Sequence, residues 1–150
     1  MATTFSALSE EDQALLQQAR TAMANAYCKY SNFKVGAALL CENGEVIVGA
    51  NHENASFGAT ICAERSAVVA ALTKGHRKFK ALAVSTELEE PCSPCGICRQ
   101  YIIEFGEYKV ILGSSTTERI IMTSTYGLLP YAFTPKSLDD HEQEQKAHNH

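Results

Sequence analysis

Four side chains that could hold and use a metal ion stand in two short stretches of this sequence. Cys62 and Glu64 lie two residues apart in the first stretch, ICAERSAV. Cys95 and Cys98 lie three residues apart in the second, SPCGICRQ. Three thiolates are soft ligands that suit Zn²⁺, and a zinc ion with three protein ligands keeps a fourth position open for water. The two stretches therefore predict one catalytic zinc site, provided that the fold brings them together.

Glu64 and Arg65 stand close to the predicted ligand Cys62 and have separate roles in this hypothesis. Because the three thiolates already occupy the coordination positions that the protein provides, the Glu64 carboxylate need not bind the metal and is free to move protons. Three thiolates around one Zn²⁺ leave a net negative charge. We predict that Arg65 offsets this charge by hydrogen-bonding to the ligand sulfurs.

Each fragment of this pattern has a simpler interpretation. A C-x-x-C pair by itself is compatible with a redox pair, half of a structural zinc site or chance. Cys62 alone would more often be a small buried apolar residue than a ligand. Cys92 could be a fourth ligand by its spacing, although the chain would have to turn sharply between it and Cys95. Cys28 and Cys41 lack this context and are predicted to be core thiols.

The predicted ligands must lie at the start of two helices. Thr60 can cap a helix over 61–74, and this cap places Cys62 in the first turn. Ser93 can likewise cap the next helix, with Cys95 in its first turn. Unpaired N–H groups and the helix dipole lower thiol pKa values at such positions, so both helix starts favour the thiolates that a metal needs.

The rest of the chain alternates between helical and strand patterns. An amphipathic helix is predicted over 10–27, with Ser9 as its cap. Two apolar runs around Asn43-Gly44 predict a β-hairpin. Three more strands are predicted, at 80–86, 108–114 and 119–124. The connection SSTTE between the last two is too short for a parallel crossover, so the last strand should be antiparallel.

This order of elements predicts an α/β protein, a three-layer α/β/α sandwich around a five-stranded mixed sheet. We expect one domain over residues 1–150, structured over about 10–138, with a polar, disordered tail over 139–150. The composition is that of a globular protein, with 45% hydrophobic and 20% charged residues.

Charge and hydropathy favour a small ligand over a large partner. The net charge is −4 and no basic run such as KRKR occurs, which predicts no nucleic-acid partner. No apolar run is long enough to span a membrane, and the first residues lack the features of a secretory signal. We expect the chain in the cytoplasm, with nuclear access left open, where six cysteines are more often thiols or metal ligands than disulfides.

Beyond these separate patterns, the sequence resembles the small cytidine deaminases. Six segments fit motifs of that family in order over about residues 10–138: YSNFKVGAALL, GANHENASF, ICAERSAV, SPCGICRQ, EFG and LLPYAFTP. The C-x-E and P-C-x-x-C pair is typical of zinc deaminases. The resemblance implies the cytidine deaminase fold, one Zn²⁺ per subunit on Cys62, Cys95 and Cys98, and Glu64 as the catalytic proton carrier. It implies hydrolytic deamination of cytidine and 2′-deoxycytidine to the uridine forms with release of ammonia, as in pyrimidine salvage.

The same resemblance implies a nucleoside-binding site. In the family the N-x-E-N motif binds the ribose, so Asn51 and Glu53 are expected to bind the sugar, and Phe33 of the S-x-F motif is expected beside the pyrimidine. Backbone groups near Ala63 could hold the base. Family members of this size are commonly homotetramers with shared active sites, and by that likeness Phe133 would reach a neighbouring site.

The residue patterns alone leave other interpretations open. NHEN could be an ordinary polar turn, Phe33 a core residue, and Phe133 a residue buried in its own chain. Alternative functions are a deaminase acting on RNA, DNA or a free base, a zinc-stabilised binding protein that has lost catalysis, and a redox protein that uses Cys95 and Cys98. Phe57 departs from the tyrosine that is frequent in relatives, which could alter a hydrogen bond near the site.

Overall fold

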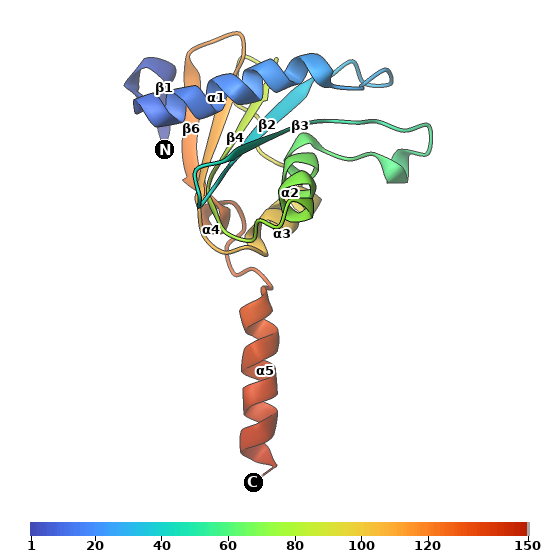
Figure 1. Cartoon of the computed structure of the whole chain (residues 1–150), viewed down its shortest axis with the longest axis vertical. Helices are drawn as coiled ribbons and strands as arrows, with labels where there is room; N and C mark the ends of the chain where they lie inside the picture. Colours follow the sequence, from blue (N-terminus) through green and yellow to red (C-terminus); the bar gives the residue numbers. More distant parts are fainter. Residues whose placement is uncertain (150) are drawn as a thin grey trace.

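The computed structural model describes residues 1–149 and builds them around one mixed β-sheet (Figure 1). Its strands follow the order β1-β6-β5-β4-β2-β3. Within residues 1–149, β4 and β5 form the one parallel pair of named strands, and the other neighbouring pairs are antiparallel. The strands are β1 (Ala2–Thr4), β2 (Val35–Cys41), β3 (Val46–Ala50), β4 (Phe79–Thr86), β5 (Lys109–Ser114) and β6 (Arg119–Ser124).

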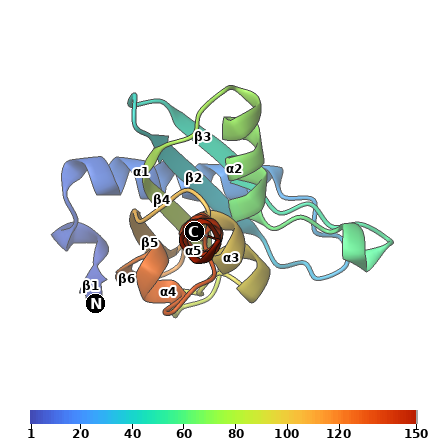
Figure 2. The same ribbon diagram turned by 90° about the horizontal axis from the view of Figure 1, so that it is seen from below.

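Helices cover both faces of this sheet. Helix α1 (Glu10–Ala22) lies across one face, while α2 (Ala63–Thr73) and α3 (Gly96–Ile103) lie on the other (Figures 1 and 2). Two cores result, one under α1 around Leu16 and one under α2 and α3 around Leu82. The predicted three-layer α/β/α class is therefore confirmed. None of the helices within residues 1–149 combines the length and apolar character that crossing a membrane requires.

Further helical segments complete the chain. They are the 3₁₀ turns Phe5–Ala7, Met23–Asn25 and Phe57–Ala59, and the helices α4 (Thr125–Leu128) and α5 (Pro135–His148). The predicted helix over 10–27 is thus shorter, because α1 ends at Ala22 and passes into a 3₁₀ turn. Its predicted cap is confirmed, since the Asp12 N–H donates to Ser9 Oγ at 3.2 Å.

The five predicted strands are all present, and a sixth was missed. The hairpin turns at Asn43-Gly44, where Gly44 takes a φ of +94°, and β6 is antiparallel to β5 as predicted. The additional strand β1 pairs with β6 at the sheet edge. A run of three residues has no recognisable alternation, so β1 depends on the edge of β6 rather than on its own sequence. The predicted count of five strands is therefore wrong by one.

The C-terminal segment differs from the disordered tail predicted over 139–150, because Pro135–His148 forms α5. Residue 150 of that prediction lies outside the described residues. Local signals account for this helix: Thr134 and Ser137 form a capping box, and Pro135 occupies the first turn. Ion pairs one turn apart, such as Lys136 with Asp140, support its exposed surface. None of its described residues is buried, and α5 projects away from the sheet and its covering helices (Figure 1).

Helix α2 carries the first cysteine motif and is fixed at both ends. At its start it lies directly on β3, because a Cβ at Gly49 would come within 2.6 Å of the Ala63 carbonyl oxygen and 2.5 Å of the Ala67 nitrogen. Only glycine allows this approach. At its end, Gly75 has a φ of +95° and forms a Schellman cap, with the His76 N–H donating to the Ala71 carbonyl at 3.0 Å.

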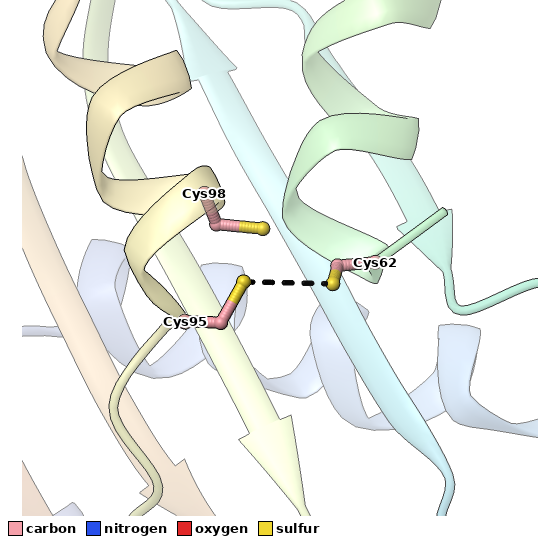
Figure 3. Close-up of side chains that lie close together, drawn as sticks. All are labelled: Cys62, Cys95 and Cys98. Atoms are coloured by element: carbon pink, nitrogen blue, oxygen red, sulfur yellow. Dashed lines mark hydrogen bonds between the residues drawn. The ribbon is translucent and has the colours of Figure 1, made fainter. Parts of the chain in front are cut away.

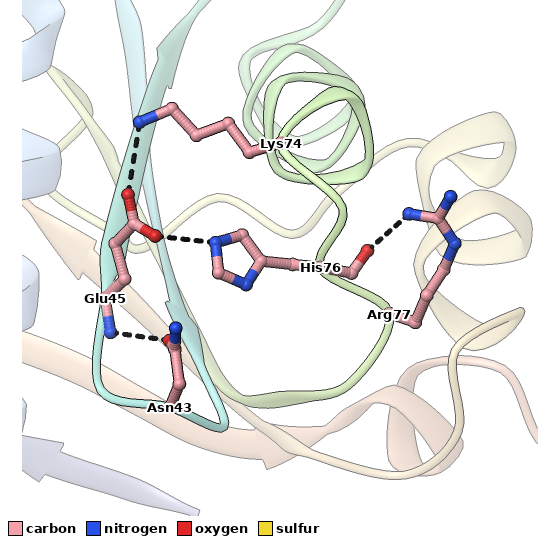
Figure 4. Close-up of polar contacts among 5 residues, drawn as sticks. All are labelled: Asn43, Glu45, Lys74, His76 and Arg77. Carbon is pink, nitrogen blue, oxygen red and sulfur yellow. Dashed lines mark hydrogen bonds and ion pairs between the residues drawn. The ribbon is translucent and has the colours of Figure 1, made fainter.

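The end of α2 is also tied to the β2–β3 hairpin through Glu45 (Figure 4). The Glu45 carboxylate accepts from Lys74 Nζ at 3.1 Å and lies 2.6 Å from His76 Nε2. The hydrogen bonds from Lys74 and then His76 hold the pKa of Glu45 below its usual range. Arg77 donates to the carbonyls of Leu72 and His76 in the same turn. These contacts join the hairpin to the end of α2.

Candidate metal centre and substrate cavity

Three cysteine sulfurs meet between the N-termini of α2 and α3 (Figure 3). The sulfurs of Cys62, Cys95 and Cys98 all lie within 4.8 Å of one another, and those of Cys62 and Cys95 are 3.9 Å apart. Sulfurs that surround one tetrahedral zinc ion at about 2.3 Å lie at comparable separations. The donor set therefore fits one Zn²⁺ and brings together the two stretches as predicted from the sequence.

Cys62 and Cys95 are themselves the N-cap residues of the two helices, which corrects the predicted helix starts. Thr60 and Ser93 do not cap. Ile61 exchanges two backbone hydrogen bonds of 2.9 Å with His52, and this bridge keeps the chain extended up to Cys62. Pro94 disfavours helical geometry in the residue before it. The N-cap of each helix thus lies two residues after the predicted one, and in both helices the N-cap residue is a ligand cysteine.

The position of the sulfurs favours thiolates. Helix N-termini carry partial positive charge, and hydrogen bonds to Cys62, first from Cys98 and then from Arg65 and Cys95, lower the pKa of Cys62 to about 5. The same shared proton raises the pKa of Cys98, helped by burial and by the Glu64 carboxylate. In the metal-free chain the surroundings of Cys62 therefore favour its thiolate. Zinc binding would deprotonate the remaining thiols.

Glu64 lies in the first turn of α2, beside the sulfurs. Its side chain is buried, with 5% of the residue exposed, and Cys98 Sγ donates to Glu64 Oε2 at 3.5 Å. Burial raises the pKa of Glu64, and the charge on Cys62 adds to this effect. A carboxyl with a raised pKa holds a proton more readily than an exposed one, which is a property that a proton carrier requires.

Arg65 Nη2 approaches Cys62 Sγ at 3.6 Å and the Thr60 carbonyl oxygen at 3.5 Å. The hydrogen bond to Cys62 raises the pKa of Arg65 further, so the guanidinium stays charged. This contact is the one expected if Arg65 offsets the negative charge of the thiolates. Cys92, the alternative fourth ligand, lies outside the sulfur group found within residues 1–149.

A cavity of about 320 Å³ opens beside the sulfurs. It brings together four of the predicted substrate-binding residues, Phe33, Asn51, Glu53 and Ala63, with Cys62, Glu64 and Cys95. Sequence reasoning missed other lining residues, chiefly Val35, Val84 and Thr86. These three come from strands β2 and β4, and a strand pattern alone does not say which helix end covers which strand end.

Asn51 and Glu53 also shape the cavity wall, a role that the sequence did not reveal. Asn51 Nδ2 donates to the Phe33 carbonyl at 2.7 Å, and Asn51 Oδ1 accepts from the Val35 N–H at 2.9 Å. Glu53 accepts from the Ser31 hydroxyl, the Ser31 N–H and the Tyr30 N–H. These bonds, led by the Ser31 hydroxyl, hold the pKa of Glu53 below its usual range. The pair therefore fixes the segment that carries Phe33.

Phe133 lies outside this cavity. It is 62% exposed, and its carbonyl accepts from Gln100 Nε2 of α3 at 2.8 Å. Its own chain therefore does not bury the ring, contrary to one interpretation left open above. Phe57 is exposed as well and meets Tyr30 edge to face, with ring centroids 5.6 Å apart.

Comparison with known proteins agrees with this geometry. Residues 9–114 match the family model described as the cytidine and deoxycytidylate deaminase zinc-binding region. A cytidine deaminase from Halalkalibacterium halodurans is 45% identical over 130 residues, which cover 85% of this chain and 98% of the relative.

Solved structures of cytidine deaminases share the fold. The enzyme from Burkholderia pseudomallei has a TM-score of 0.78 at 45% identity, covering 84% of this chain and all of that one. The enzyme from Mycobacterium tuberculosis has a TM-score of 0.70 at 35% identity, covering 83% of this chain and 98% of that one. With three sulfurs that fit zinc beside a buried carboxyl, the chain belongs to the cytidine and deoxycytidylate deaminase family, as a zinc-dependent hydrolytic cytidine deaminase.

Proposed function

We propose that this enzyme converts cytidine and 2′-deoxycytidine to uridine and 2′-deoxyuridine, with release of ammonia, in pyrimidine salvage. The observation that carries the proposal is one cavity whose wall holds two ligand sulfurs, the Glu64 carboxyl and the Asn51 and Glu53 side chains. Its volume of about 320 Å³ lies at the small end of ligand sites, which favours a nucleoside over a nucleic acid. A cytoplasmic location is part of this proposal, and six free thiols are compatible with it.

Zinc held by Cys62, Cys95 and Cys98 would supply a Lewis acid that lowers the pKa of a water molecule toward neutrality. In our proposal Glu64 takes the proton of that water as the oxygen attacks C4 of the cytosine ring. Glu64 then gives that proton to N3. It later carries the remaining proton of the attacking oxygen to the amine, which leaves as ammonia as the C4–N bond breaks. The burial that raises the pKa of Glu64 suits this double role, because the carboxyl must hold each proton for part of the reaction.

The sugar would lie at the end of the cavity formed by Asn51 and Glu53. Each keeps hydrogen-bonding capacity after its contacts within the chain. Asn51 Nδ2 and Oδ1 each retain one free site, and the Glu53 carboxylate, which accepts three bonds, can accept one more. Phe33 would lie beside the pyrimidine, and the Ala63 N–H, at the start of α2, would face its polar edge.

One assay tests the proposed substrates. Purified protein is analysed for zinc, and the fall in ultraviolet absorbance is followed with cytidine, 2′-deoxycytidine, cytosine and a single-stranded oligonucleotide as substrates. We expect about one zinc per chain and turnover of both nucleosides only. Turnover of cytosine at a similar rate would contradict a sugar-reading site, and turnover of the oligonucleotide would contradict a nucleoside enzyme.

Replacement of Arg65 tests its proposed charge-balancing role. Residues that support metal ligands typically change metal affinity or activity by about 10- to 100-fold when mutated, so we expect Arg65→Gln to lose turnover or zinc affinity in that range. Arg65→Lys keeps the charge and should recover part of the loss. Zinc affinity is measured by competition with a chromophoric chelator. An Arg65→Gln variant with full zinc affinity and full turnover would remove Arg65 from this role.

We further propose a homotetramer in which Phe133 reaches the active site of a neighbouring subunit. An apolar surface on α3 supports an interface there, since Ile97, Tyr101 and Phe105 line a shallow hollow on its outer side. Phe133 is held close to this helix through Gln100 and exposes its ring.

Mixing two variants, one impaired in substrate binding and one inactive, tests this sharing of sites. Phe133→Ala should raise KM, and Glu64→Ala should abolish turnover. If Phe133 acts across subunits, co-refolded mixtures of the two variants contain some sites with both Glu64 and Phe133 and regain activity. Light scattering coupled to size exclusion gives the oligomeric state. A tetramer whose mixtures regain nothing would place Phe133 in its own site or outside any site.

A further inference from the structure

One wall of the substrate cavity carries a buried hydroxyl with no assigned task. Thr86 ends β4 and lines the cavity next to Val84 and Val35. The residue is 2% exposed, and its Oγ1 atom has no hydrogen-bond partner within residues 1–149. A buried hydroxyl without a partner is costly, so such a group in a binding cavity points to a ligand that completes it.

The register of the sheet places the Thr86 side chain on the side of α2 and the cavity. Side chains alternate along a strand, and Leu82 and Val84 of β4 pack in the core beneath α2 and α3. Thr86 follows them on the same face. It is directly opposite Val35 of β2, and residues opposite one another in an antiparallel pair share a face. Val35 lines the same cavity, which agrees with this placement.

We propose that the Thr86 hydroxyl hydrogen-bonds a polar atom of the pyrimidine ring and so helps the enzyme hold its nucleoside, an inference that rests on the proposed function. The strand wall formed by Val35 and Val84 is otherwise apolar and suits the flat face of a base. The sugar-binding candidates Asn51 and Glu53 follow β3, which is separated from β4 by β2 in the sheet. Thr86 is therefore assigned to the base, on the β4 side of the cavity, and not to the sugar.

The neighbouring residue supplies a matched control. Ser85 is 0% exposed, and its Oγ also has no hydrogen-bond partner within residues 1–149. It faces the opposite layer, because it pairs with Gly36, where an added Cβ would lie 1.9 Å from the Ala19 carbonyl of α1. Both hydroxyls are buried and lack a partner, but only the Thr86 side chain lines the cavity. Ser85 therefore serves as the control.

The test compares Thr86→Val, Thr86→Ser and Ser85→Ala with the wild type. Thr86→Val keeps the shape and removes the hydroxyl. We expect it to lower kcat/KM for cytidine by about 3- to 10-fold, the usual worth of one hydrogen bond, and to weaken uridine binding in calorimetry similarly. The melting temperature without ligand should stay equal or rise by roughly 2–4 °C, because an unpaired buried group is removed.

The control variants separate binding from folding. Thr86→Ser retains the hydroxyl and should keep kcat/KM near the wild-type value, and Ser85→Ala should leave kcat/KM unchanged. Thr86→Val with wild-type kcat/KM and wild-type uridine affinity would overturn the inference. A Thr86→Val protein that melts well below the wild type would also overturn it, because the hydroxyl would then serve the free fold. Absence of deamination by the wild type would instead refute the proposed function.

Discussion

Glu64→Gln is expected to lower the turnover of cytidine by about 10²- to 10⁴-fold or more while the protein keeps its zinc. The substitution preserves the size of a side chain that is almost fully buried, but an amide cannot carry protons between water, N3 and the leaving amine. The three sulfurs remain in place, so the metal should be retained. Steady-state kinetics together with zinc analysis of the same preparation measure both effects.

Stability provides the control for this variant. Burial raises the pKa of Glu64, which means that an ionised Glu64 costs folding free energy and that this cost grows as pH rises above the ordinary carboxyl pKa. Removal of the titrating group should therefore leave the melting temperature at neutral pH unchanged or raise it. Glu42→Gln, on the exposed hairpin, should change neither turnover nor zinc content. Near-native activity in Glu64→Gln would exclude Glu64 as the proton carrier.

The second large effect is expected from the sulfur that lies deepest. Cys98 is fully buried between α2 and α3, where solvent cannot replace it as a ligand. Cys98→Ala leaves two sulfurs, and loss of a direct ligand should exceed the roughly 10- to 100-fold cost of losing a supporting residue. We expect zinc content to fall far below one per chain at micromolar protein, and deamination to be lost with it.

A neighbouring cysteine makes this test specific. Cys92 lines the substrate cavity but lies outside the sulfur group, so Cys92→Ser should retain about one zinc per chain. Titration with zinc, followed by chelator competition, compares the two variants with the wild type. Equal zinc content in Cys98→Ala and the wild type would show that Cys98 is not a ligand. Loss of zinc in Cys92→Ser would instead make Cys92 a ligand.

Features that a single element controls were predictable from the sequence. The Ser9 cap, the turn at Asn43-Gly44 and the antiparallel β6 follow from side-chain chemistry and loop length over a few residues. The spacing within C-x-E and C-x-x-C is of the same kind, because one helix turn decides which side chains point together. Helix α5 also has local signals in the sequence, at Thr134 and Ser137, although its polar composition is typical of disorder.

Features that depend on two distant segments were decided by the tertiary structure. The bridge between His52 and Ile61 delays the start of α2 until Cys62, and a local capping rule cannot anticipate a hydrogen bond to another segment. Strand β1 exists because β6 offers it an unpaired edge. The proposed role of Thr86 also depends on tertiary structure, because its hydroxyl lines the cavity only where residues of α2 lie next to the end of β4. Local sequence thus determined the ligands and their helices, and packing determined what surrounds them.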